Sequence, residues 1–101
     1  MINLTSKIEQ WAVERNLHTA EPHKQAIKLG EEFGELCSGL AKDNIDVVRD
    51  SLGDMYVVMT ILAMQLDMDI MRCIEEAYEE IKDRKGKLVN GTFIKEDDLP
   101  K

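Results

Sequence analysis

Four acidic residues are spaced so that they could share one metal site. Glu32 and Glu35 stand three residues apart, and Asp50 and Asp54 stand four apart. Residues at either spacing share one face of a helix. Gathered carboxylates repel one another and are driven toward protonation. A hard cation removes that repulsion, and Mg²⁺ favours oxygen ligands. The spacing therefore predicts a magnesium site, with Mn²⁺ as an alternative metal.

The apolar neighbours of these acids strengthen the metal interpretation. Phe33 and Leu36 alternate with the first acidic pair, and Asp54 directly precedes the apolar residues 55–58. Solvated acids normally lie on the face opposite such residues. The competing interpretation is a solvated acidic helix face, because 33% of the residues are charged. Spacing alone leaves both interpretations open.

Other metal and phosphate motifs are missing from the sequence. A di-iron carboxylate bundle needs Glu-x-x-His on its helices, but Arg15 and Ala20 stand three residues before His18 and His23. The sequence also lacks an EF-hand calcium loop and a glycine-rich phosphate loop ending in Gly-Lys-Ser/Thr.

Basic residues that could contact phosphate fall in two places. Lys28 lies one turn before Glu32, and a second group, which follows the expected fourth helix, consists of Lys82, Arg84, Lys85 and Lys87. Cations pair well with phosphate oxygens. They are also favoured at a helix C-terminus by the helix dipole alone. Both explanations stay open for the second group.

Trp11, Cys37 and Cys73 each have a structural and a functional interpretation. Trp11 is a candidate for stacking on a substrate base, although a place in the core is the preferred interpretation. The two cysteines form no Cys-x-x-Cys pair. We interpret them as small buried residues and reduced thiols, which favours a cytoplasmic protein.

Size and charge limit the partners. The 101 residues suffice for one domain over residues 1–101 and carry a net charge of −7, which disfavours general binding to nucleic acid. The longest apolar run, residues 55–64, is too short to cross a membrane. A domain this small buries a limited share of its surface, so a homodimer or homotetramer is expected.

The apolar spacing predicts an all-α fold resembling a four-helix bundle. The expected helices cover about residues 4–16, 22–42, 45–66 and 70–84, and the apolar second half of the third is expected to be buried. Pro22 suits the first turn of the second helix, Asp43 and Asn44 can cap the third, and Asp67 and Asp69 can cap the fourth. Asn90-Gly91 between short apolar runs predicts a hairpin within the tail, residues 86–101, whose last residues, 95–101, are expected to be loose.

The apolar residues of the second helix are expected on one face: Ala26, Leu29, Phe33, Leu36, Cys37 and Leu40. Those expected to point inward from the fourth helix are Ile70, Cys73, Ile74, Ala77 and Ile81. Gly30, Gly34 and Gly53 inside helices suggest close approach of a second helix or a ligand.

Three segments resemble the MazG-like all-α nucleotide pyrophosphohydrolases. They are residues 28–36 (KLGEEFGEL), 50–55 (DSLGDM) and 79–91 (EEIKDRKGKLVNG). The family pattern is Glu-Glu-x-x-Glu, a spacer, then Glu-x-x-Asp, and the last segment is similar to the C-terminal part of short, phage-type members. The resemblance extends over residues 11–99. It implies hydrolysis of a nucleoside triphosphate to the monophosphate and pyrophosphate.

The resemblance also implies roles for individual residues. Glu32, Glu35, Asp50 and Asp54 would hold Mg²⁺, so that Glu35 serves catalysis as a ligand. Glu31 would orient or deprotonate the attacking water, unless it is an ordinary exposed helix residue. The side chains that would contact the phosphates of the substrate are those of Lys28, Lys82 and Lys85.

Two departures from the family pattern matter. Glu79 stands where many members have Asn, three residues before the phosphate-contacting Lys, and the third metal ligand also differs. The family's second Glu would stand at Ser51, so Asp50 is expected to substitute for it, or Ser51 to act through a bound water. A degraded site would leave the alternative function: a non-catalytic helical module that binds a nucleotide or a partner.

Overall fold

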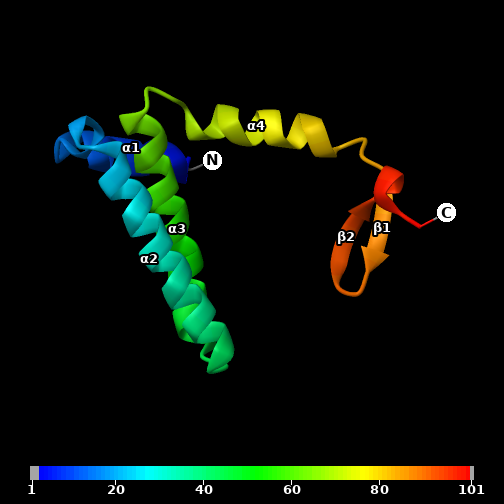
Figure 1. Cartoon of the computed structure of the whole chain (residues 1–101). Coiled ribbons are helices and arrows are strands. Elements are labelled where there is room, and N and C mark those ends of the chain that lie inside the picture. The colour runs from blue at the N-terminus through cyan, green and yellow to red at the C-terminus, as the bar shows by residue number, and fades with distance from the viewer. Residues whose placement is uncertain (1–2, 101) are drawn as a thin grey trace. The chain divides into compact units, whose positions relative to one another are not determined.

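The computed structural model describes residues 3–100, which fall into two compact units divided after Met71 (Figure 1). The first unit contains α1 (Leu4–Glu14), the 3₁₀ helix η1 (Leu17–Thr19), α2 (Pro22–Ala41) and α3 (Ile45–Gln65). The elements that follow are α4 (Ile70–Ile81), β1 (Gly86–Val89), β2 (Thr92–Lys95) and the 3₁₀ helix η2 (Glu96–Asp98). The mostly helical fold with a small hairpin is confirmed, and the expectation of a single domain stays a prediction.

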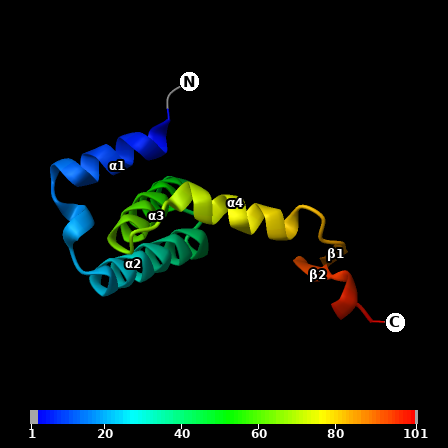
Figure 2. The same cartoon turned by 90° about the horizontal axis from the view of Figure 1, so that it is seen from above.

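Helices α2 and α3 form an antiparallel hairpin, and both views show them side by side (Figures 1 and 2). Pro22 opens α2, where its fixed φ suits the first turn and its missing N–H costs nothing. Asn44 caps α3, as the sequence predicts, because its side-chain oxygen accepts a hydrogen bond from the Val47 amide at 3.3 Å. The short turn between the helices forces them to pack against each other.

Asparagine and aspartate, rather than glycine, end the helices of the first unit. Asn16, Asp43 and Asp67 have φ values of 58°, 53° and 57° and follow α1, α2 and α3. These two residue types enter the left-handed region more readily than other side chains do. Each of these helices is therefore followed closely by a polar residue in the left-handed region.

Helix α3 is the centre of the first unit, in agreement with the prediction that its second half is buried. Val58, Ile61 and Ala63 on α3 are buried together with Ala12 on α1. Burying a valine or isoleucine side chain contributes roughly 1.5–3 kcal/mol. Because α3 contacts α1, η1 and α2, its apolar side holds the unit together.

Polar bonds tie the shorter elements to α3. The hydroxyls of Thr5 on α1 and Tyr56 on α3 are 2.5 Å apart, and the sulfur of Met71 lies 3.7 Å from both. The Gln65 amide donates to the Leu17 carbonyl at 2.9 Å, which fixes η1 against the end of α3. None of the helices within residues 3–100 is long and apolar enough to cross a membrane.

Close helix contact occurs at Gly39, a position that the sequence did not single out. A Cβ at Gly39 would lie 2.9 Å from Val47 Cγ1 and 3.2 Å from Val48 Cγ2. At Gly30, Gly34 and Gly53 it would meet no atom within 4 Å. The suggested close approach at these three glycines is therefore wrong for contacts inside the described chain.

Replacing Gly39 by alanine is expected to lower the free energy of unfolding by about 1 kcal/mol. Overpacking against two stiff valines costs about 1–3 kcal/mol, and the better helix propensity of alanine returns up to about 1 kcal/mol. Gly53→Ala is the matched control and should stabilise the protein instead. Urea denaturation of both variants measures the difference, and equal midpoints would contradict the contact.

Helix α4 is shorter than expected, and its packing in a bundle stays a prediction. It ends at Ile81, not at residue 84, and every residue from Met71 to Ile81 is exposed in the described structure. The residues expected to point inward are thus exposed in the described structure, and their place in a core stays a prediction: Cys73, Ile74, Ala77 and Ile81. Cys37 is exposed as well, so the interpretation of both cysteines as buried residues is wrong. Asp69 does cap α4, accepting from the Met71 amide at 2.9 Å.

The predicted hairpin is confirmed. Strands β1 and β2 pair antiparallel with Gly86 opposite Lys95 and Val89 opposite Thr92. Asn90 and Gly91 form the two-residue turn with φ values of 51° and 81°, as a type I′ turn requires. The tail expected to be loose continues into η2, and the Glu96 amide donates to the Lys85 carbonyl at 2.8 Å.

Candidate functional site

The hairpin register places Glu32 level with the acids of α3. Toward one end of α2, Gly39 lies against Val47. Toward the other end, the Gln25 amide donates to the Val58 carbonyl at 3.3 Å. Glu32 lies between these two contacts on α2, and residues 50–54 lie between them on α3. The expected juxtaposition of the two acidic pairs therefore follows from the register.

The electrostatics of Glu32 reflect this neighbourhood. Burial raises the pKa of the Glu32 carboxyl above its ordinary value of 4.5. Repulsion from Glu35, Asp54 and Asp50 raises that pKa further, while the nearby Lys28 ammonium lowers it. A carboxyl surrounded by like charge and withdrawn from water holds its proton more tightly than a solvated one. The Glu32 carboxyl thus lies in the combined electrostatic field of the three other acids.

One oxygen of Glu32 lacks a partner. Its Oε2 atom is buried and accepts no hydrogen bond within residues 3–100. A buried carboxylate oxygen without a donor is costly, and three further carboxylates act on the same group. A divalent cation would satisfy that oxygen and neutralise the repulsion. The donor set therefore fits a hard metal ion in its chemistry.

The other acids differ in their exposure. Asp54 is half-buried, whereas Glu31, Glu35 and Asp50 are exposed. Within residues 3–100, the side chains do not form any group of three or more acidic, His or Cys residues already gathered around one point. Binding a metal would require the exposed side chains to turn toward Glu32.

Ser51 lies inside the hairpin. Its exposed fraction is 1%, although the resemblance places an acidic ligand at this position. A small hydroxyl side chain can be packed there, whereas a glutamate would bring a further negative charge into the interior. Asp50, one residue earlier, carries its carboxylate on the open side of α3.

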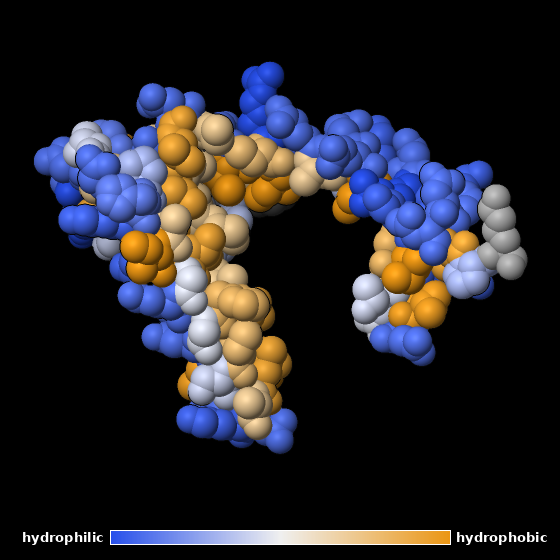
Figure 3. All heavy atoms as spheres, viewed as in Figure 1, coloured by the Kyte–Doolittle hydropathy of each residue, from blue (hydrophilic) through white to orange (hydrophobic). Residues whose placement is uncertain are grey.

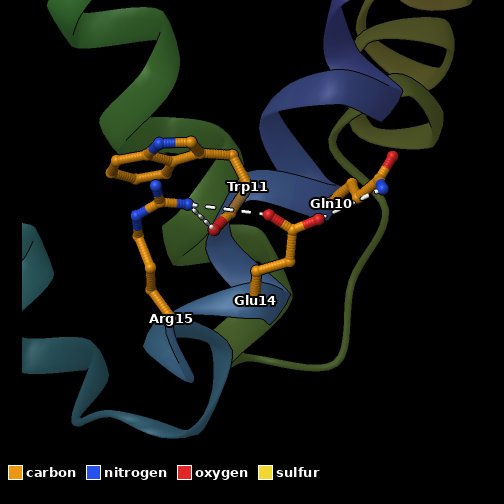
Figure 4. Close-up of polar contacts among 4 residues, drawn as sticks. All are labelled: Gln10, Trp11, Glu14 and Arg15. Atoms are coloured by element: carbon orange, nitrogen blue, oxygen red, sulfur yellow. Dashed lines mark hydrogen bonds and ion pairs between the residues drawn. The ribbon is translucent and has the colours of Figure 1, made fainter.

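Trp11 is exposed on α1, so its interpretation as a core residue is wrong. Its exposed fraction is 45%, and the Arg15 guanidinium lies 4.4 Å from the ring centroid (Figure 4). Arg15 also donates to the Trp11 carbonyl at 3.0 Å and lies 3.8 Å from Glu14. A base could stack on this ring face only by displacing Arg15.

The second basic group lies in the second unit, around the end of α4. The Lys82 ammonium pairs with Glu79 at 2.7 Å, while Lys87 is on β1 opposite Ile94. A pocket of about 430 Å³ is lined by Arg84 and Lys85 together with Lys95 and four acids: Glu80, Asp83, Glu96 and Asp97. Lys95 was not among the predicted candidates, although the Asn90-Gly91 turn fixes the register that brings it back to Gly86.

Comparison with known proteins identifies one phage relative. The chain is 60% identical over 67 residues to an uncharacterized 18.2 kDa protein of the rep-hol intergenic region of Haemophilus phage HP1 (strain HP1c1). The match covers 65% of the chain and 41% of the phage protein, so the chain spans less than half of that relative. No protein-family model and no solved structure matches the chain.

Proposed function

We propose that this protein is a magnesium-dependent hydrolase that converts nucleoside triphosphates to the monophosphate and pyrophosphate. One observation carries the proposal: the buried, unpartnered Glu32 oxygen lies within the field of three further carboxylates. The sequence resemblance to MazG-like enzymes supplies the reaction. The nucleoside triphosphate is therefore a proposed substrate, and magnesium, or manganese, a proposed cofactor.

In this proposal Glu32, Glu35, Asp50 and Asp54 hold the metal. A bound Mg²⁺ ion supplies charge neutralisation for phosphate oxygens and for the acids themselves. Glu32 is the central ligand because one of its oxygens is buried and accepts no hydrogen bond within residues 3–100. Glu35 and Asp50, being exposed, adjust their side chains to complete the set.

The chain's other polar residues have distinct proposed tasks. Lys28 lies near enough to act on the Glu32 carboxyl, and its ammonium can also pair with a phosphate oxygen. Exposed Glu31 accepts a proton from the attacking water, whose oxygen bonds to phosphorus as the bond between the α and β phosphates breaks. Positioning and charge complementarity account for most of the catalysis of such reactions. Trp11 has the weakest support among the binding residues, because Arg15 already stacks on its ring.

An alternative function is a non-catalytic helical module that binds a nucleotide or a partner. Buried Ser51 favours it, because the residue cannot supply the carboxylate that the resemblance expects. The two functions differ in one measurable respect, since only the hydrolase turns over its nucleotide.

The proposal also concerns the cellular environment and the oligomeric state of the protein. The thiols of Cys37 and Cys73 are free and exposed, which suits a reducing, cytoplasmic environment. A homodimer or homotetramer remains the expected assembly. The net charge of −7 still argues against general nucleic-acid binding, so the nucleotide is expected as a free small molecule.

A pyrophosphate-release assay over ribo- and deoxynucleoside triphosphates tests the proposal. We expect equal amounts of monophosphate and pyrophosphate with Mg²⁺, and none with chelator. Mn²⁺ should restore release after chelation. Binding of nucleotides without turnover, at high protein concentration and with either metal, would favour the non-catalytic module.

A further inference from the structure

The side of α2 that packs against α3 includes Glu32 as one of its regular members. The residues of α2 that are at least partly buried lie on one stripe, at alternating spacings of three and four: Pro22, Gln25, Leu29, Glu32, Leu36 and Gly39. Residues with this spacing form the seam between two packed helices. Gly39 is the smallest member of the stripe and is buried. How closely the helices approach at Gly39 therefore affects the surroundings of Glu32.

Two kinds of contact hold Gly39 against Val47 of α3. A Cβ at position 39 would lie 2.9 Å from Val47 Cγ1, so glycine alone allows this approach without a shift. Asn44 in the turn bonds to both residues: its amide donates to the Gly39 carbonyl at 2.8 Å, and its side-chain oxygen accepts from the Val47 amide at 3.3 Å. Figure 3, in the same view as Figure 1, shows that the turn end of the hairpin consists of α2 and α3 alone within the first unit. The separation of the helices there is therefore set by this contact.

The same contact fixes the level of two of the acids. Glu32 lies seven residues before Gly39 on α2. Asp54 lies seven residues after Val47 on α3. Seven residues make about two helical turns, or about 10.5 Å along the axis, and return a side chain to nearly the same face. In the antiparallel pair, Glu32 and Asp54 therefore lie level with each other. Repulsion from Asp54 raises the pKa of Glu32, in agreement with this register.

A methyl group at position 39 would open the hairpin at its turn. Val47 is β-branched, so its side chain has few alternative rotamers with which to make room. Beyond the acids, the Gln25 amide donates to the Val58 carbonyl at 3.3 Å and holds the two helices together. An opening at the turn would therefore tilt α2 away from α3 and separate the acids that lie between the two contacts.

We infer that Gly39 is a positioning residue whose contact with Val47 sets the selectivity of the acids between a small divalent cation, Mg²⁺, and a larger one, Ca²⁺. Mg²⁺ demands near-ideal octahedral geometry with oxygens at about 2.0–2.1 Å, whereas Ca²⁺ accepts flexible arrangements at about 2.3–2.6 Å. Separating the acids therefore weakens the binding of Mg²⁺ more than that of Ca²⁺. The inference rests on the proposed metal site and adds a residue that touches neither metal nor substrate.

Calorimetric titration of the chelator-treated full chain with Mg²⁺ and with Ca²⁺ tests the inference without nucleotide or turnover. Gly39→Ala should weaken Mg²⁺ binding by about 10-fold, as losing an indirect support of a metal ligand does, and leave Ca²⁺ binding close to that of the wild type. The readout is the ratio of the two dissociation constants. A variant that is merely less stable loses affinity for both ions alike, so its ratio does not change.

Two further variants separate positioning from stability. Gln65→Ala removes the 2.9 Å hydrogen bond to the Leu17 carbonyl at the far end of α3, and it should lower stability without changing the ratio. Gly39→Ala combined with Val47→Ala makes room for the new methyl group and should restore the wild-type ratio. Circular dichroism at the titration temperature verifies that each variant is folded.

The outcomes distinguish this inference from the proposed function. Equal losses for both ions in Gly39→Ala, or a ratio that Val47→Ala fails to restore, would overturn the role of Gly39 and leave the proposed metal site standing. A wild-type chain that binds neither ion at millimolar concentrations would overturn the metal site itself, and this inference with it.

Discussion

Replacing Asp54 by asparagine is expected to lower magnesium-dependent pyrophosphate release by more than about 100-fold and to leave helicity unchanged. Removing even an indirect support of a metal ligand commonly costs about 10–100-fold, and the amide removes a negative charge from the ligand set itself. Asp54 is half-buried and acts directly on the Glu32 carboxyl. Glu35→Gln should have the same effect, measured as initial rates at saturating Mg²⁺.

Asp46→Asn is the matched control for this experiment. Asp46 lies on α3 one turn before Asp50, but its side chain is exposed and pairs with Arg49 at 3.1 Å. Losing a surface pair of this kind changes stability by about 1 kcal/mol at most. The control should therefore retain full activity. Full activity in both Asp54→Asn and Glu35→Gln would exclude the assigned ligand set.

Glu32→Gln is expected to stabilise the metal-free protein at neutral pH and to weaken its response to magnesium. The pKa of Glu32 is raised in the folded state, so the folded protein binds this proton more tightly than the unfolded chain does. The stabilising contribution is complete below pH 4.5, the ordinary pKa, and is lost as pH rises through the raised value. The wild-type melting temperature in chelator should fall across that window, and the fall should be smaller in Glu32→Gln.

Magnesium should reverse this loss in the wild-type protein at pH 7. A ligand at ten times its Kd stabilises the folded state by about 1.4 kcal/mol, which corresponds to a rise in Tm of about 5–10 °C for a domain of this size. Glu31→Gln, on an exposed part of the same helix, should behave like the wild type in chelator. A Glu32→Gln variant with a wild-type pH slope and a full magnesium response would show that Glu32 is not part of the site.

Local sequence signals predicted the elements of the fold well. Pro22, Asn44 and Asp69 mark helix starts, and Asn90-Gly91 marks the hairpin turn, because each acts through its own backbone or its nearest neighbours. The predicted ends of the four helices differ from the observed ends by one to three residues. Helix ends depend on where unpaired carbonyls find partners, which apolar spacing does not encode.

Packing could not be predicted in the same way. Periodicity identifies an apolar face but not the element that covers it, so Leu29 and Phe33 looked equivalent although Leu29 is partly buried and Phe33 is exposed. The same limit explains why Cys37 and Ile74 were expected to be buried. Gly39 was overlooked because a close contact depends on the register between helices, and neither helix specifies that register alone.

The candidate site was partly accessible from sequence. The three- and four-residue spacing identified the two acidic pairs. The short turn between the second and third helices implied that the pairs would face each other. The dominant role of Glu32 required the structure, because burial and one unpartnered oxygen distinguish it from Glu35. Lys95 was missed because its neighbourhood arises from cross-strand pairing and not from nearby residues in the sequence.

The position of the acids within the hairpin has a kinetic consequence. Contacts between α2 and α3 near the turn at Asp43 are local, so we expect this hairpin to close from its turn early in folding. Glu35 and Asp50 lie at nearly equal separations from that turn and meet first, and Glu32 and Asp54 meet one step later. Each of these two meetings brings negative carboxylates together. In the metal-free chain, their repulsion should slow the closure of the hairpin. Higher ionic strength screens these charges, and refolding should accelerate with added salt even before any cation is specifically bound.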